Sequence, residues 1–248
     1  MLMLMRSQIE AMRAVAYTAA GQVDRSYHGS SDDVRAAAES RLSLLTPVVK
    51  GWCTEKSEEV TSLGIQIHGG KGYVEETGAA QHYRDARILA IYEGTNGIQA
   101  ADLAGRKVLG DEGREIGKLI AELRETCTGM QDDESLAAIA ASVNAGLDQL
   151  EQGVRWLLAN AMSHPAALGA SSFNMLMLTG TVLGAAYLAK GVAAATAAGG
   201  TDAGLLKEKV ATTAFYCAHV LPRAQGYLAA MMADPEITMA LPADAFLD

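Results

Sequence analysis

A single carboxylate, Glu93, stands in the segment IYEGTNGIQ (residues 91–99), between apolar and small neighbours. A carboxylate with apolar neighbours can have its pKa raised, and such a group suits the removal of a weakly acidic C–H proton. Gly94 leaves room beside it for another molecule to approach the backbone. The same carboxylate would also stabilise a helix starting near Thr95, because the N-terminal end of a helix is positive. The residue types and spacing leave both roles open.

A second segment, QIHGGKG (residues 66–72), combines three glycines with a histidine and a lysine. Turns of this kind expose backbone N–H groups that can hold phosphate. The segment lacks the ending of a Walker A loop, and no strand precedes it as in a Rossmann fingerprint. A helix that ends at a glycine accounts for the same residues without any ligand. Both interpretations therefore stay open as well.

The sequence gives no indication of a metal site or a disulfide framework. His68 has no second potential metal ligand near it in the sequence. The three cysteines, Cys53, Cys127 and Cys217, form no CxxC pair and no Cys/His cluster. We therefore expect three free thiols in a reducing compartment.

These residues must be positioned by helices, because apolar residues recur at helical spacing along the chain and no strand-like alternation of useful length occurs. In the first half, the spacing predicts a helix over residues 2–25 and a second one after capping candidates at residues 30–33. Pro47 is expected to kink or restart that second helix, which then runs to His68. Thr77 is a candidate cap for a short helix through Arg84, and a further helix is expected from Thr95 to Leu109.

Gly110 to Gly113 is the predicted domain boundary. Beyond it, periodicity predicts helices over residues 114–128, 134–163, 166–198 and 202–233. The expected fold is all-α, with two helical bundles in series that comprise residues 1–110 and 111–248.

Residues 166–198 are apolar enough to raise the question of a membrane span. Polar residues and a lysine interrupt the run, and two glycines favour close helix packing. Because a spanning helix needs about 20 nearly uncharged apolar residues, we expect a buried central helix of the bundle and no membrane span.

Composition sets outer limits on function. The 248 residues are 50% hydrophobic and carry a formal net charge of −9. Nucleic-acid binding needs a basic patch, so this balance disfavours it. An ordinary cytoplasmic protein is expected. The start, Met-Leu-Met-Leu-Met-Arg, lacks the order of a signal peptide and is typical of a helix interior, which suggests a piece of a longer protein.

The run GIQIHGGKGYVEETGAAQHYRDARILAIYEGTNGIQAADLAGRKVL (residues 64–109) resembles the C-terminal helical domain of flavin-dependent acyl-CoA dehydrogenases. The family pattern of Gln-x-x-Gly-Gly-x-Gly, Arg-Asp and Tyr-Glu-Gly-Thr is matched at separated positions, which makes the likeness specific. The matching residues are Gln66, Gly69, Gly70, Gly72, Arg84, Asp85, Tyr92, Glu93, Gly94 and Thr95. The residues around these motifs are most similar to the longer branch of the family, which includes 3-methylmercaptopropionyl-CoA dehydrogenases. Proteins of that branch carry a C-terminal helical extension, and residues 114–248 resemble it.

The resemblance implies α,β-dehydrogenation of an acyl-CoA thioester. In this family the glutamate at the position of Glu93 removes the α proton while a hydride leaves the β carbon for the flavin N5. A backbone N–H of that glutamate and a ribityl hydroxyl of FAD polarise the thioester oxygen. Tyr92 and Gly94 would contact the substrate.

The resemblance also implies cofactor contacts and partners. Gln66, Ile67, His68, Gly69 and Gly70 would contact the ADP half of a FAD held mainly by a neighbouring subunit. Thr95, Asn96 and Gly97 would contact FAD near its pyrophosphate or adenine side. A homodimer or homotetramer is implied, with electron-transfer flavoprotein as the electron acceptor.

The N-terminal helical domain, the middle β-domain and the first helix of the C-terminal domain have no counterpart in these 248 residues. In the family those parts cover the flavin and shape the acyl pocket. We therefore expect the chain to be inactive alone. The alternative is a catalytically inactive helical assembly module or a fragment without bound FAD.

Overall fold

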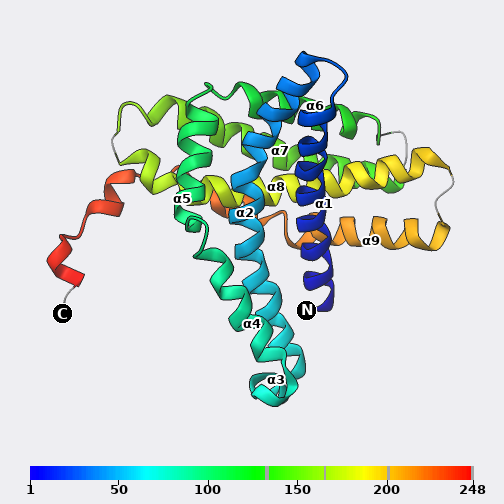
Figure 1. Ribbon diagram of the computed structural model, residues 1–248, viewed down its shortest axis with the longest axis horizontal. Helices are drawn as coiled ribbons and strands as arrows, with labels where there is room; N and C mark the ends of the chain where they lie inside the picture. Colours follow the sequence, from blue (N-terminus) through cyan, green and yellow to red (C-terminus); the bar gives the residue numbers. More distant parts are fainter. Residues whose placement is uncertain (132–133, 165, 200–201, 247–248) are drawn as a thin grey trace.

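In the computed structural model, which describes residues 1–131, 134–164, 166–199 and 202–246, the chain is built of helices (Figure 1). No strand occurs in these ranges, so the all-α prediction is confirmed. The longer helices are α1 (Leu2–His28), α2 (Asp32–His68), α6 (Arg114–Thr128), α7 (Glu134–Asn160), α8 (Ala167–Ala198), α9 (Ala203–His219) and α10 (Arg223–Met231).

Shorter elements connect or follow them. Those in the first half are α3 (Gly70–Tyr73), η1 (Glu75–Thr77), α4 (Ala79–Arg87), η2 (Ile88–Ala90), α5 (Asn96–Ala101) and η3 (Asp102–Leu109), and those at the C-terminal end are η4 (Pro235–Met239) and η5 (Ala243–Phe246). The C-terminal half of α2, with α3, η1 and α4, projects from the bundle; we call this part the projection (Figure 1).

Helix α8 is the centre of the bundle. Its residues from Met175 to Ala189 are buried, and it packs against α1, α2, α7, α9 and α10. A Cβ atom added to Gly180 would lie 2.1 Å from Cγ of Trp52, so only glycine lets α2 come this close. Helix α8 is long and apolar enough to cross a membrane, but 89% of its most apolar window is buried inside the protein. The prediction of a buried central helix is therefore confirmed.

Helix α2 runs without interruption through Pro47, so the predicted restart after Thr46 is wrong, while the predicted kink stays a prediction. Proline inside a helix removes one backbone hydrogen bond and costs about 3 kcal/mol. Pro47 is itself buried, and the turns on either side bury Leu44, Leu45, Val48 and Trp52. This burial outweighs the local cost. The N-terminal cap was predicted correctly, because the Ser31 hydroxyl accepts the N–H of Val34 at 3.3 Å.

Two other local predictions are wrong. Thr77 does not cap α4, because its hydroxyl donates to the carbonyl oxygens of Lys71 (2.6 Å) and Val74 (3.1 Å). The single helix expected over residues 202–233 is two helices, α9 and α10, which meet at Pro222. Proline at the start of α10 needs no backbone N–H there, which allows a new helix to begin.

The helix predicted from Thr95 to Leu109 changes its winding part-way. Thr95 caps α5 by accepting the N–H of Ile98 at 3.4 Å. From Asp102 the winding widens to a π-helix, and the N–H of Gly110 bonds to the carbonyl oxygen of Gly105 at 2.9 Å. The apolar core continues from α1 to α10 across residue 110. The division into two bundles at residues 110–113 stays a prediction.

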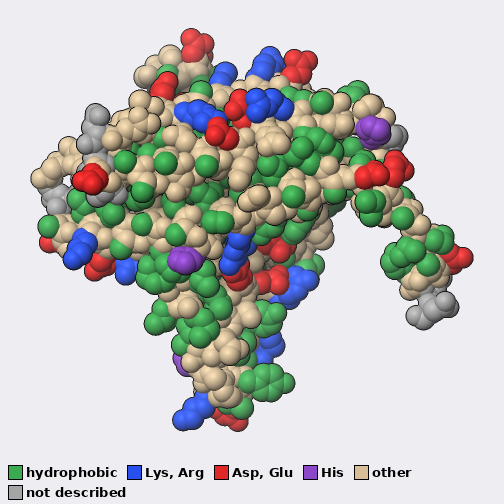
Figure 2. Space-filling model, turned by 180° about the vertical axis from the view of Figure 1, so that it is seen from behind, with side chains coloured by type: hydrophobic (Ala, Val, Ile, Leu, Met, Phe, Trp, Pro, Cys, Tyr) green, Lys and Arg blue, Asp and Glu red, His purple; other side chains and the backbone are tan. Residues whose placement is uncertain are grey.

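The projection exposes large apolar side chains. Figure 2 shows hydrophobic side chains over this part of the molecule. Tyr73 is 80% exposed, and Ile67, Val74 and Tyr83 are exposed as well. Arg87 joins α4 to α2 through Glu58 (3.1 Å), whereas Arg84 pairs with Glu75 within the projection (3.5 Å).

Candidate functional site

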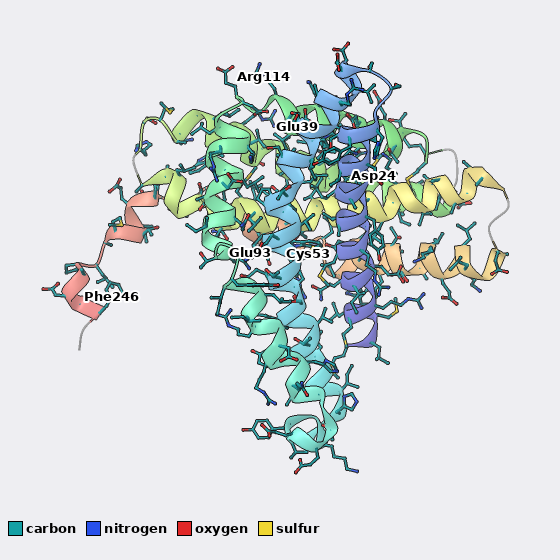
Figure 3. The ribbon with its side chains drawn as sticks, viewed as in Figure 1. Asp24, Glu39, Cys53, Glu93, Arg114 and Phe246 are labelled. Atoms are coloured by element: carbon teal, nitrogen blue, oxygen red, sulfur yellow. The ribbon has the colours of Figure 1, made fainter. Side chains whose placement is uncertain are left out.

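Glu93 lies in the turn between η2 and α5, beside α2 (Figure 3). The 3₁₀ turn before it ends with the N–H groups of Ile91 and Tyr92 both bonded to the carbonyl oxygen of Ile88. Glu93 and Gly94 then both take positive φ, at +56° and +82°. A glutamate in this region is strained by about 1–2 kcal/mol, whereas glycine is not.

Two side chains, those of Lys50 and Gln99, donate hydrogen bonds that fix this turn. Lys50 of α2 donates to the carbonyl oxygen of Gly94 at 2.7 Å and to Oδ1 of Asn96 at 2.9 Å. Gln99 donates to the carbonyl oxygen of Glu93 at 3.2 Å. Burial lowers the pKa of Lys50, and the nearby carboxylates of Glu55 and Glu93 oppose that shift. The turn is therefore tied to α2 through Lys50.

Asn96 is the buried anchor of the turn, only 4% exposed. Its amide nitrogen donates to Thr54 and Glu55, both at 2.8 Å, and its oxygen accepts from Lys50. The polar groups of this side chain are thus all used inside the protein. Any cofactor contact by Asn96 would have to come from its backbone.

Glu93 lines one end of a groove of about 400 Å³ between α1 and α2. Most of the wall is apolar or small: Ala16, Ala19, Ala20 and Val23 of α1 with Leu42, Thr46 and Val49 of α2. Lys50 and Gln99 lie at the same end as Glu93. The apolar wall of the groove therefore comes from two helices that are distant from Glu93 in the sequence.

The backbone N–H groups around the turn point to a second property of the site. Those of Glu93 and Gly94 donate to no partner among the described residues, nor do those of Asn96 and Gly97 at the start of α5. Free N–H groups beside a carboxylate can bind a carbonyl oxygen that gains negative charge. Tyr92, Gly94, Thr95 and Gly97 are all exposed here.

The glycine segment lies at the far end of the projection, where α2 stops at His68. Gly69 takes φ +60° and ends the helix, and residues 66–70 are exposed. A Cβ atom added to Gly69 or Gly70 would meet nothing within 4 Å. The N–H of Gly70 has no partner among the described residues, so this tip offers open backbone to a ligand.

The structure does not bring the two segments together. Gln66 lies sixteen residues beyond Lys50 along α2, which corresponds to about 24 Å. The open backbone at Gly70 fits the phosphate-bearing part of a dinucleotide, and the free N–H groups of residues 93–97 fit a polar group near the carboxylate. The open backbone at the tip and at residues 93–97 is therefore suited to FAD. Because the two regions lie so far apart, they would contact different parts of one FAD or two different FAD molecules.

Sequence reasoning missed Lys50 and the α1 wall of the groove. A lone lysine in the apolar run Val48-Val49-Lys50-Gly51-Trp52 was the available signal for the first. The α1 wall of the groove gave no such signal, because alanines at helical spacing are equally typical of any packed helix face.

Comparison with family models gives two matches. Residues 1–108 match the model described as acyl-CoA dehydrogenase, C-terminal domain. Residues 119–242 match the model described as acetyl-CoA dehydrogenase C-terminal like.

Curated relatives agree with these models. The 3-methylmercaptopropionyl-CoA dehydrogenase of Ruegeria pomeroyi is 43% identical over 231 residues, which cover 89% of this chain and 38% of that protein. A butyryl-CoA dehydrogenase of Syntrophomonas wolfei is 28% identical and covers 100% of this chain and 41% of its own length. The chain thus spans about two fifths of the length of these relatives.

A solved structure shares the fold. The acyl-CoA dehydrogenase of Bacillus anthracis, solved with FAD, superposes with a TM-score of 0.71 at 21% identity, over 99% of this chain and 42% of that one. This structure shows the shared fold, and the two family models show the family. The chain belongs to the acyl-CoA dehydrogenase family of flavoprotein oxidoreductases and corresponds to the C-terminal helical part of its members.

Proposed function

We propose that this chain is the base-bearing part of an FAD-dependent acyl-CoA dehydrogenase, with Glu93 as the base. The observation behind the proposal is the strained turn that holds the Glu93 carboxylate at the end of an apolar groove, next to unpaired backbone N–H groups. A role as a helix-end charge would need neither the positive φ nor the groove.

In the proposed reaction, Glu93 takes the proton from the carbon α to the thioester carbonyl. The N–H of Glu93 donates to the thioester oxygen, which makes that C–H bond more acidic. The electron pair of the Cα–H bond forms the Cα=Cβ double bond, and a hydride leaves the β carbon. FAD, when bound, supplies the acceptor for that hydride.

The groove between α1 and α2 offers an apolar surface to the acyl chain. Gly94 has no side chain to obstruct the thioester, and Tyr92 is exposed beside it. Substrate contacts are therefore proposed for Tyr92 and Gly94.

Cofactor contacts are proposed at the two open backbone regions. Gln66, Ile67, His68, Gly69 and Gly70 would contact the ADP half of a FAD that is held mainly by a neighbouring subunit. Thr95, Asn96 and Gly97 would contact FAD nearer the reacting end, with Asn96 acting through its backbone.

The exposed apolar side chains of the projection support assembly. Tyr73, Val74 and Tyr83 are large and solvent-exposed on the projection, which carries the glycine segment, and exposed apolar patches mark interaction sites. We propose a homodimer or homotetramer, electron-transfer flavoprotein as the acceptor, and a cytoplasmic location.

The test compares Glu93→Gln with the wild type in the complete gene product. FAD content is measured first, and then flavin absorbance is followed by stopped flow after mixing with butyryl-CoA or 3-methylmercaptopropionyl-CoA. We expect the variant to bind FAD and to reduce it at least about 100-fold more slowly, the contribution of a general base.

Glu112→Gln is the matched control, since Glu112 is an exposed glutamate that also takes positive φ, at +58°. It should reduce the flavin at the wild-type rate. Near-normal reduction in Glu93→Gln would place the base elsewhere. A wild-type protein that binds FAD but shows no reduction with acyl-CoA substrates would favour the assembly module.

A further inference from the structure

A second cavity lies where α1, α2, α6 and α8 meet, on a different side of the α1–α2 pair from Glu93. It has a volume of about 150 Å³, roughly that of five waters in the liquid. Its lining residues are Thr18, Gln22, Arg25, Ala37, Ala38, Arg41, Leu119, Glu122, Leu123, Tyr187 and Lys190. None of them lines the Glu93 groove.

The cavity is bordered by more positive than negative charge. Arg25, Arg41 and Lys190 face the single lining carboxylate of Glu122. Arg41 is already bonded to Glu122 (2.8 and 2.9 Å) and to Glu115 (2.6 Å). Counting Glu115 as well, three cations still outnumber two carboxylates.

The two remaining cations have no direct partner. Arg25 and Lys190 make no side-chain hydrogen bond or ion pair within the described part of the chain, and the same holds for the amide of Gln22. Both cations act on Glu122 only at longer range, and the hydrogen bonds from Arg41 hold the pKa of Glu122 below its ordinary value. Their donors are therefore free for an anion.

An independent observation comes from Tyr187. This side chain is 6% exposed, and its hydroxyl is buried without a hydrogen-bond partner. Burial raises the pKa of Tyr187, and the charges that also act on it belong to Arg41 and Glu122, which line the same cavity. The hydroxyl is thus a donor left unsatisfied at the buried side of a cationic cavity, and buried polar groups without a partner call for an explanation.

We propose that this cavity binds a phosphate group. Arg25, Gln22 and Lys190 would donate to its oxygens from α1 and α8, and Tyr187 would donate from the buried side. Donors that converge from different helices suit a tetrahedral oxyanion with several acceptor oxygens better than a planar carboxylate. The site would hold either free phosphate or the terminal phosphate of a larger molecule. It is independent of the proposed dehydrogenation.

The test measures binding by isothermal titration calorimetry at constant ionic strength and saturating FAD. Inorganic phosphate is the first probe and ADP the second. We expect at least one of them to bind the wild type and to bind Lys190→Gln, Arg25→Gln and Tyr187→Phe about tenfold more weakly or worse, as for the loss of one hydrogen bond with a charged partner.

Matched controls are Lys207→Gln and Arg13→Gln, which remove exposed cations from outside this cavity. They should bind the probe as the wild type does. Tighter binding of ADP than of phosphate would assign the site to the phosphate of a larger molecule, and the reverse order to free phosphate. No binding of either probe to the wild type, or equal binding by Lys190→Gln and the wild type, would overturn the proposal.

Discussion

Lys50 donates to the carbonyl oxygen of Gly94 at 2.7 Å, so one side chain of α2 holds the turn that presents Glu93. The same ammonium bonds to the buried Asn96, the first residue of α5. The position of the carboxylate therefore depends on a residue more than forty positions away in the sequence.

Replacing Lys50 by methionine should displace this turn while keeping the length of the side chain. We expect the rate of flavin reduction by acyl-CoA to fall about 10- to 100-fold, since small misplacements of a reacting group have effects of this size. The free energy of unfolding should fall by about 1–2 kcal/mol. Stopped-flow reduction and urea unfolding measure the two effects. Lys207→Met is the control, and an unchanged reduction rate in Lys50→Met would show that Lys50 does not position Glu93.

The positive φ of Glu93 predicts a conflict between stability and activity. Glu93→Gly should raise the free energy of unfolding by about 1 kcal/mol, because glycine adopts this backbone conformation without strain. The same change should abolish turnover. Glu112 takes φ +58° outside the site, so Glu112→Gly should stabilise the protein by a similar amount with full activity. Urea unfolding and turnover assays of both variants measure this; a loss of stability in both would contradict the strain argument.

Two glycines of α8 should respond in opposite ways to alanine. A Cβ atom at position 180 would lie 2.1 Å from Cγ of Trp52, so Gly180→Ala should destabilise the protein by about 3 kcal/mol or more. Gly191 has no atom within 4 Å of an added Cβ, so Gly191→Ala should stabilise the helix by about 0.5–1 kcal/mol. Thermal and urea unfolding distinguish the two, and a tolerated Gly180→Ala would mean that α2 and α8 pack more loosely.

Acid should weaken the attachment of α10 to α2. Burial disfavours the charge of Glu59, but the hydrogen bonds from Arg223 (2.8 Å) and the charge of Lys56 overcome it, so the pKa of Glu59 lies below the ordinary 4.5. The folded state thus binds this proton more weakly than the unfolded state. The stabilisation is complete above about pH 4.5 and is lost as the pH falls through the lowered pKa.

Glu59→Gln should therefore cost about 1 kcal/mol at pH 7, an amount reduced because both partners are partly exposed. The difference from the wild type should shrink as the pH falls below 4.5. Urea unfolding over this pH range measures it. Glu76→Gln removes an exposed glutamate without an ion pair among the described residues and should show no such convergence. A difference that stays constant with pH would contradict the assignment.

The sequence predicted the helices well where capping and periodicity agree. Ser31 and Thr95 cap helices as expected, and α8 was expected to be buried. Pro47 was misjudged because its local cost is offset by packing of residues far away in the sequence, which periodicity does not record. At Pro222 the expected single helix is divided in two, because proline is tolerated where a helix begins and α10 starts directly after it.

Much less of the candidate site could be predicted. The motif around Glu93 identified the turn, but its positive φ depends on Lys50 and Gln99, and the groove depends on α1 lying beside α2. Asn96 was expected to face a cofactor, whereas its side chain is used to anchor the turn. The roles of Glu93 and of the cofactor-binding residues stay predictions.

The packing of α8 against α1 and α2 has a consequence for biosynthesis. Trp52 and Val15 leave the ribosome more than a hundred residues before the helix that covers them. At about 5–20 residues per second, this apolar face waits for its cover for roughly 5–25 seconds. During that interval the apolar faces of α1 and α2 stay uncovered, and α8 itself emerges as a segment that is long and apolar enough to cross a membrane.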